Sequence, residues 1–162
     1  MSDMDDLLAV LEAHERELQF ERMDHDLAWE LGVYLRERAA QAGHGIVIDV
    51  ALGEQDVFRA ALPGTTSHND KWIDRKKRTV REWGTSTYLA GLRFPLYNPP
   101  FSLETAPWVD ARLYSGSGGG FPLTVRGAGV VGTIAVSGLP PELDHAFMVE
   151  SLRDFLRRPA VH

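Results

Sequence analysis

Two stretches of the chain carry residues whose types and spacing could do chemistry. The first contains Asn69, Trp72, Arg75 and Lys76 within a strongly basic segment. Lys76 follows Trp72 by four residues, which places it on or beside the apolar face of a helix. A lysine in that position either extends past packed aromatic rings to reach solvent or holds an anion in a cleft.

An anion site is one reading of this basic segment. Arg75 is next to Lys76, and Asn69 can offer its amide from the start of the same helix. Together with the unpaired amides of a helix N-terminus, these groups could bind a carboxylate or a phosphate. The alternative is an exposed charged helix face that pairs with acidic residues of a neighbouring subunit.

The second stretch is a predicted strand, turn and helix. Residues 130–136 form a short apolar run that is rich in β-branched side chains and bounded by glycine, as expected of a strand buried on both faces. The prolines at 140–141 favour the start of a helix. This arrangement brings Ser137, Asp144 and His145 to one rim.

Asp144 and His145 have two possible roles. Adjacent residues on a helix do not face each other, so the two side chains do not form a dyad. Asp144 is placed to act as an N-terminal charge or a cap contact. His145 could be a ligand or a general acid–base group, because imidazole titrates near neutral pH. In the alternative, both residues order the turn and make subunit contacts.

Other suggestive patterns do not meet the requirements of known motifs. The glycine-rich run 116–120 lacks the ending of a phosphate loop and precedes a strand, so it is expected to permit close backbone approach or a bent strand entry. Ser137 lacks the glycine two positions earlier that a nucleophile elbow needs. No nucleophile, base and orienting group stand together, which leaves open whether the chain is an enzyme.

Composition limits the class of protein. The chain has 162 residues, a formal net charge of −6 and no cysteine. The acidic balance argues against a nucleic-acid or anionic-membrane binder. The absence of cysteine excludes disulfides and thiolate metal sites and fits a reducing compartment. An acidic N-terminus and the lack of a long apolar run predict neither a signal peptide nor a membrane span, so we expect a cytoplasmic protein.

The hydrophobic pattern predicts a single α+β domain over residues 1–162, with one antiparallel sheet flanked by helices. Turn and cap residues divide the chain into the order α, α, β, β, α, a long loop, β, β, α. The predicted helices span residues 5–20, 28–42, 70–88 and 144–157, and the predicted strands span 46–52, 57–62, 121–126 and 130–136.

The long loop, residues 91–108, is rich in proline and aromatic residues between Phe94 and Trp108. So much ring surface is more than a monomer usually exposes, so a subunit interface is its expected use. A surface that binds another protein is the alternative.

Several motifs together resemble the haem-degrading-domain family, which includes GlcG-like and HbpS-like proteins and the corrinoid-linked PduO C-terminal domains. The similarity is closest to a branch of uncharacterised proteins and covers about residues 5–157. The motifs are Leu62-Pro-Gly-Thr-Thr66, Asn69-x-x-Trp72-Ile-x-Arg-Lys76, Gly119-x-Phe-Pro122, and Gly129-Val-Val-Gly-Thr-Ile-Ala-Val-Ser-Gly-Leu-Pro140 followed by Asp144-His145.

The resemblance implies a profilin-like α/β/α fold and a homo-oligomer packed as a ring or double ring. It also suggests haem as a cofactor or ligand, and haem breakdown or a corrinoid-related reaction as the chemistry. One departure matters. Relatives in this branch tend to carry a histidine where this chain has Ser117. Any haem chemistry that uses such a histidine is therefore not available here.

The histidines offer few metal or haem ligands. None stands in an HExxH or HxH pattern, so the sequence predicts no local zinc site. A haem needs only one axial histidine. His25, near the start of the second helix, and His68, in a loop, are open candidates. Each is alternatively a surface or capping residue.

Three functions follow from these observations. The first is an oligomeric binding protein with a pocket at a subunit boundary, which takes a small anionic or tetrapyrrole ligand of haem or corrinoid type. The second is a haem-degrading or corrinoid-related enzyme, and the third is a protein-interaction scaffold. The residues expected to line the pocket of the first are Asn69, Trp72, Arg75, Lys76, Ser137, Asp144 and His145.

Overall fold

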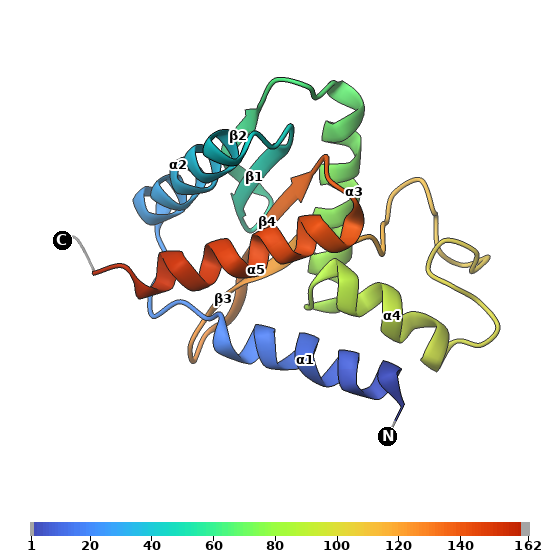
Figure 1. Cartoon of the computed structure of the whole chain (residues 1–162). Helices are drawn as coiled ribbons and strands as arrows, with labels where there is room; N and C mark the ends of the chain where they lie inside the picture. Colours follow the sequence, from blue (N-terminus) through green and yellow to red (C-terminus); the bar gives the residue numbers. More distant parts are fainter. Residues whose placement is uncertain (1, 160–162) are drawn as a thin grey trace.

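The computed structural model describes residues 2–159. Over these residues the chain is an α+β protein, as the sequence predicts (Figure 1). The helices are α1 (Asp3–Glu17), α2 (His25–Ala42), α3 (Ser67–Trp83), α4 (Thr87–Tyr97) and α5 (Pro141–Arg157), and the strands are β1 (Val47–Leu52), β2 (Gln55–Ala61), β3 (Gly120–Val125) and β4 (Gly129–Ser137). Within the described part of the chain, no helix is both long and apolar enough to traverse a bilayer.

The strands form one sheet in the order β2-β1-β4-β3, and every neighbouring pair is antiparallel. Both predicted hairpins are confirmed, and β1 pairs with β4 to join them at the centre. The register places Val47 opposite Ser137, so β4 ends level with the start of β1.

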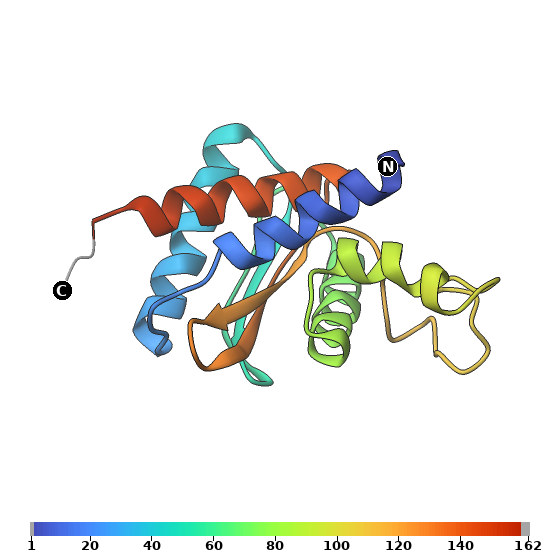
Figure 2. The same cartoon turned by 90° about the horizontal axis from the view of Figure 1, so that it is seen from below.

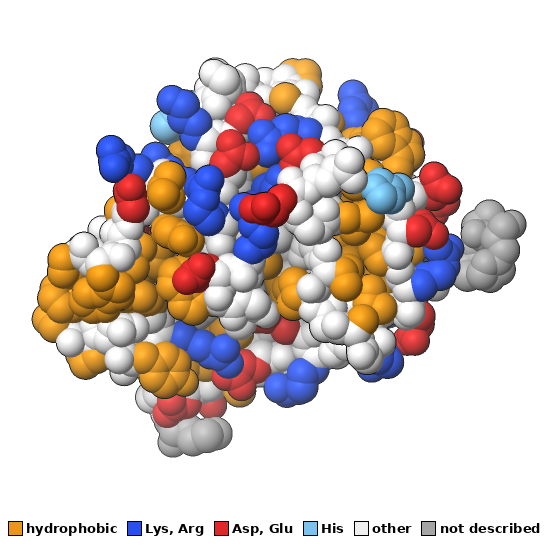
Figure 3. All heavy atoms as spheres, turned by 180° about the vertical axis from the view of Figure 1, so that it is seen from behind, with side chains coloured by type: hydrophobic (Ala, Val, Ile, Leu, Met, Phe, Trp, Pro, Cys, Tyr) orange, Lys and Arg blue, Asp and Glu red, His pale blue; other side chains and the backbone are white. Residues whose placement is uncertain are grey.

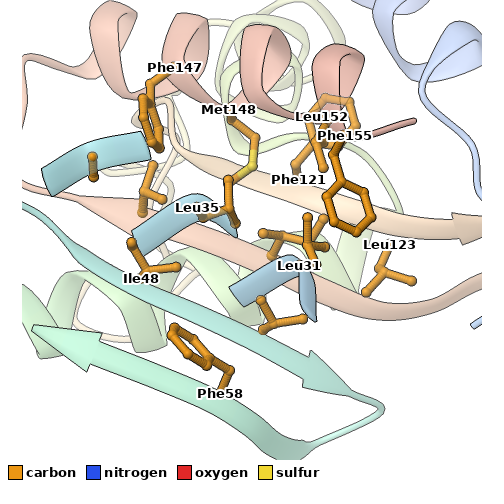
Figure 4. Close-up of a cluster of buried hydrophobic side chains, with 14 of the residues drawn as sticks. Leu31, Leu35, Ile48, Phe58, Phe121, Leu123, Phe147, Met148, Leu152 and Phe155 are labelled. Atoms are coloured by element: carbon orange, nitrogen blue, oxygen red, sulfur yellow. The ribbon is translucent and has the colours of Figure 1, made fainter. Parts of the chain in front are cut away.

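The two faces of the sheet differ in chemistry. On one face, Ile48 and Ile134 pack with Leu35 of α2 and Met148 of α5 in the main apolar core (Figure 4). On the opposite face, alternate residues of the same strands contact α3, and this smaller cluster contains Val47, Ile73 and Ala135. The sheet lies between α5 and α3 in Figure 2.

The prediction of one helix over residues 70–88 and a loop from residue 91 is wrong. Helix α3 ends at Trp83 because Gly84 adopts a left-handed conformation with φ of 69°. Ser86 then caps a new helix, α4, by accepting a hydrogen bond from the Leu89 amide. Pro95 stands inside the last turn of α4, so the helix lacks the hydrogen bond that an amide at this position would donate. The irregular segment therefore starts later than expected.

The expectation that the strand at 130–136 is buried on both faces holds only in part. Strand β1 ends at Leu52, opposite Gly132, so the first residues of β4 extend beyond their neighbour. Val130 is accordingly 44% exposed. The other predicted elements are present with ends shifted by a few residues, as is common at element boundaries.

Gly119 allows β3 to begin directly against β4. Its φ of 127° is a conformation that favours glycine, and its carbonyl accepts a hydrogen bond from the Val136 amide. A Cβ at this position would overlap the Val136 carbonyl oxygen and lie 2.8 Å from the Lys76 Nζ. The glycine-rich run therefore permits the close backbone approach that the sequence predicts.

We expect Gly119→Ala to lower the free energy of unfolding by about 2–4 kcal/mol, because it combines backbone strain with overlap. Gly127→Ala is the matched control, since Gly127 has a φ of 82° and, apart from its chain neighbours, no described residue lies within 4 Å of the place that its Cβ would take. The control should lose only about 1–2 kcal/mol. Denaturant unfolding of both variants tests this, and equal losses would show that the overlap at Gly119 is harmless.

Candidate functional site

Two helix N-termini and the end of the central strand meet at one place in the fold. Helix α3 starts at a capping box, in which Thr66 accepts from the helix and the Thr66 amide donates to Asn69 Oδ1 at 3.0 Å. Helix α5 starts at Pro141, shortly after β4 ends at Ser137. Asn69 therefore keeps its side-chain amide nitrogen free to donate to another group.

A buried ion pair joins these elements. Lys76 Nζ lies 3.3 Å from Asp144 Oδ2 and donates to the Val136 carbonyl at 2.9 Å. The side chains are 3% and 2% exposed, respectively. Asp144 also accepts from the backbone amides of Leu139, at 3.1 Å, and Gly138, at 3.4 Å. Both amides precede the first residue of α5, so Asp144 orders the turn between β4 and α5, as in the alternative role that the sequence offers it.

Burial acts on both partners of this pair. Loss of hydration lowers the pKa of the Lys76 amine, and the Asp144 carboxylate opposes that shift. Burial likewise raises the pKa of Asp144, against the effects of Lys76 and the Leu139 amide. Desolvation therefore pushes each partner toward its neutral form, a free amine beside a carboxylic acid.

An open cavity of about 250 Å³ lies over this pair. Its lining includes five of the seven residues that the sequence predicts in a pocket, namely Asn69, Trp72, Lys76, Ser137 and Asp144. The complete lining is Asn69, Trp72, Lys76, Ser117, Ser137, Gly138, Leu139, Pro141 and Asp144.

Arg75 and His68 lie beside the cavity rather than in its lining. The Arg75 guanidinium stacks over the Trp72 ring, 4.7 Å from its centroid. The Trp72 indole nitrogen donates to His68 Nε2 at 3.2 Å. Trp72 is therefore held between an imidazole and a guanidinium.

His145 points away from the cavity, contrary to its place in the expected pocket. Side chains of adjacent helical residues project about 100° apart. Asp144 faces Lys76, so His145 turns toward α1 and α4, where its ring lies 5.2 Å from that of Tyr88 and 5.9 Å from that of His14. It is 5% exposed, and neither ring nitrogen has a hydrogen-bond partner among residues 2–159. Burial lowers its pKa to about 4, which keeps the imidazole neutral.

A second cavity, of about 210 Å³, lies on the other side of the glycine-rich run. Ser117 and Pro141 line both cavities, so the two form adjoining parts of one groove. Sequence reasoning missed this second part, because Tyr88, Gly91 and Leu92 belong to α4, the helix that the sequence pattern does not predict. Its lining is Tyr88, Gly91, Leu92, Gly116, Ser117, Gly118, Pro141 and Glu142.

The remaining histidines that the structure describes are not placed to form a metal centre. His25 pairs with Gln55 at the surface, and His162 lies outside the described residues. Over residues 2–159, no group of three or more histidine, aspartate or glutamate side chains is placed to hold a metal ion.

Comparison with known proteins identifies the family. Residues 23–153 match the family described as haem degrading protein HbpS-like. The chain belongs to this HbpS-like family. A UPF0303 protein of Streptomyces avermitilis is 47% identical over 149 residues, which cover 92% of this chain and 90% of that protein.

Solved structures share the fold of this HbpS-like chain. The crystal structure of Ybr137w protein matches with a TM-score of 0.81 and 28% identity, covering 92% of this chain and 87% of that one. The crystal structure of a PduOC:Heme complex matches with a TM-score of 0.65 and 20% identity, covering 82% and 93%. The family match begins after α1, so the helix that carries His14 lies outside the matched range of the HbpS-like family.

The buried imidazole of His145 generates a pH prediction. Its pKa is lowered from 6.5 to about 4 in the folded chain, so the unfolded chain binds more protons between those values. Its stabilising contribution is therefore complete above about pH 6.5 and is lost as pH falls toward 4. Through this histidine, the wild type should lose up to about 3 kcal/mol of unfolding free energy as pH falls toward 4. We expect His145→Leu to remove that loss.

Urea unfolding of wild type and variant across this pH range measures the difference. His25→Leu is the control, because it makes the same substitution at an exposed histidine and leaves the buried imidazole of His145 in place. A His145→Leu slope equal to that of wild type would mean that the imidazole is not buried in its neutral form.

Proposed function

We propose that the chain is a small-molecule-binding protein whose groove takes an anionic ligand, with a carboxylate-bearing tetrapyrrole of haem type as the larger candidate. The observation that carries this proposal is the buried Lys76 at the floor of an open cavity. Its nitrogen has two protein acceptors, Val136 and Asp144, so an ammonium keeps one N–H for a ligand.

Positive local charge favours an anion at this cavity, although the chain as a whole is acidic. Asn69 is the third residue of α3 and Pro141 is the first of α5, and both line the cavity. Helix N-termini carry partial positive charge and unpaired amides, which favour carboxylate and phosphate groups. The free amide nitrogen of Asn69 adds a donor.

The size of the groove bears on the ligand. Each part, about 250 and 210 Å³, is smaller than the roughly 300–1,000 Å³ typical of sites for drug-sized ligands. A small carboxylate or phosphate fits within one part. A tetrapyrrole would have to span both parts and would need a second copy of the chain to cover its outer face.

Haem is the tetrapyrrole that the family and the PduOC:Heme structure favour. Its carboxylates match the Lys76 and Asn69 end of the groove, and His68 offers an exposed imidazole at the rim beside Trp72. Lys76 and Asn69 fit the polar edge, and His68 would serve as an axial ligand only by releasing its Nε2 from the Trp72 N–H. Bound haem would supply redox chemistry. Among the described residues, the serines of the groove have no hydrogen bond to a histidine that could activate them as nucleophiles.

Another cleft is less suited to an anion. It lies between α2 and the end of α5 and includes Phe20, Leu27 and Phe155. Its cations are already engaged, since Arg22 pairs with Asp24 and Arg158 lies over the Phe155 ring.

Asn69→Asp tests the proposed site without removing the helix cap, because aspartate keeps the acceptor for the Thr66 amide. It replaces a donor with a negative charge that repels an anion. We expect succinate and phosphate to bind the wild type in calorimetry, and Asn69→Asp to weaken that binding by at least about tenfold, or about 1.4 kcal/mol. Hemin titration, followed in its Soret band, should weaken in parallel.

Gln41→Glu adds the same negative charge at an exposed position on α2, and this variant should bind succinate, phosphate and hemin like wild type. His68→Ala should change the Soret shift while leaving succinate binding intact. No heat with either anion and a hemin response that is equal in every variant would refute the proposed site.

The same proposal assigns the exposed aromatic surface to a contact between copies of the chain. Tyr97 is 77% exposed, Trp108 is 61% exposed and Leu96 is 53% exposed. Figure 3 shows hydrophobic side chains gathered at this end of the molecule, over α4 and the segment after it. A contiguous apolar surface of this kind is typical of an interface.

We expect the wild type to form an oligomer and the double variant Tyr97→Ser/Trp108→Ser to have a lower mass in light scattering. Trp29→Ser is the control, because Trp29 is a similarly exposed tryptophan on α2. A monomeric wild type, or a double variant of unchanged mass, would contradict this assignment.

A further inference from the structure

The chain has an unusual distribution of lysine. Of its 17 basic residues only three are lysine, and all three, Lys71, Lys76 and Lys77, lie on α3. Lys71 is exposed, whereas Lys76 and Lys77 are 3% and 5% exposed. Arginine cannot lose its proton in a protein, but a buried lysine can. The two buried positions therefore hold lysine, which, unlike arginine, can lose its proton and become a nucleophile.

The two buried lysines meet different partners. Lys77 Nζ contacts two carboxylates, those of Asp56 and, at 3.1 Å, Asp49, which together stabilise an ammonium. Lys76 Nζ meets a single carboxylate, Asp144, and a neutral backbone carbonyl, Val136. With less compensating charge, Lys76 is the lysine that burial favours as a neutral amine.

The geometry at Lys76 also accommodates the neutral amine that forms when the ammonium of the ion pair passes one proton to Asp144. Such an amine has two N–H bonds, and Lys76 has two protein acceptors. The remaining tetrahedral position carries the lone pair. Lys76 has no third partner among the described residues and lines the cavity. The lone pair is thereby available to a molecule in the cavity.

We propose that Lys76 forms an imine with a small 2-oxo acid bound in this cavity. The proposal rests on the anion site proposed above. The 2-oxo acid's carboxylate would occupy the position near Asn69 and the N-termini of α3 and α5, and its ketone carbon would face the amine. A cavity of about 250 Å³ limits the substrate to a few carbon atoms.

The covalent step balances with groups that are present. The Lys76 nitrogen attacks the carbonyl carbon, which forms a C–N bond and moves the π electrons to oxygen. One proton from the amine and one from the Asp144 carboxylic acid end on that oxygen, the C–O bond breaks, and water leaves. The products are a protonated imine on Lys76 and the Asp144 carboxylate, which form an ion pair in place of the neutral pair.

Reductive trapping tests the proposal on the intact protein. Pyruvate and cyanoborohydride near about pH 7 convert an imine into a stable carboxyethyl amine, which peptide mapping locates; an ordinary lysine is less than about 0.1% neutral at that pH. We expect Lys76 to be modified at least about tenfold faster than exposed Lys71, with Lys77 unmodified. Faster modification of Lys71 or Lys77 than of Lys76 would overturn the proposal.

Two further measurements separate this proposal from the anion site. Succinate should slow trapping at Lys76 and leave Lys71 unaffected. Lys76→Arg should abolish the adduct; if that variant does not fold, the wild-type peptide map alone decides. Succinate binding without an adduct at Lys76 would leave the anion site standing and refute the imine. An adduct at Lys76 that succinate does not slow, with no heat of binding, would refute the anion site alone.

Discussion

The buried pair of Lys76 and Asp144 is the constraint on which the candidate site depends. It joins α3 to the start of α5 across the end of β4, so three elements distant in sequence share one ionic contact. Removing one partner of such a pair typically costs about 3–5 kcal/mol, because the other is left buried and unpaired. The position of the amine, of the cavity above it and of the β4–α5 turn are therefore set together, before any ligand binds.

The pair also follows from the division of the sheet into two unlike faces. One face carries the aliphatic and aromatic core under α2 and α5, and the other is covered by α3, which brings charged side chains inward. Fully buried Asp49 is compensated there by Arg59 at 2.8 Å and by Lys77. A helix so rich in cations packs on a sheet where acids meet its buried lysines. Asp144 meets Lys76 and Asp49 meets Lys77, two adjacent residues near the middle of α3.

Much of the fold is predictable from short-range patterns, and the errors have physical causes. The hairpins and Asp24, the cap of α2, are predictable because they are encoded by neighbouring residues. The sequence also predicts Lys76, Ser137 and Asp144 in one pocket, and the structure brings these three together. The break at Gly84 and helix α4 are missed because a segment rich in proline favours a loop, whereas the Ser86 cap and tertiary packing maintain the helix through Pro95. The orientation of His145 toward α1 depends on long-range packing that no local pattern shows.

The glycine-rich run limits which side chains can line the groove. At Gly118 and Gly119 any Cβ would overlap the neighbouring backbone, so the run lies flat over Asp144 and His145 and cannot carry side chains there. Ser117 is the first residue before that flat section, and it lines both cavities. Serine brings a hydroxyl and no imidazole to the edge that the two cavities share, so the titratable side chains in the lining of the cavity over the ion pair are Lys76 and Asp144.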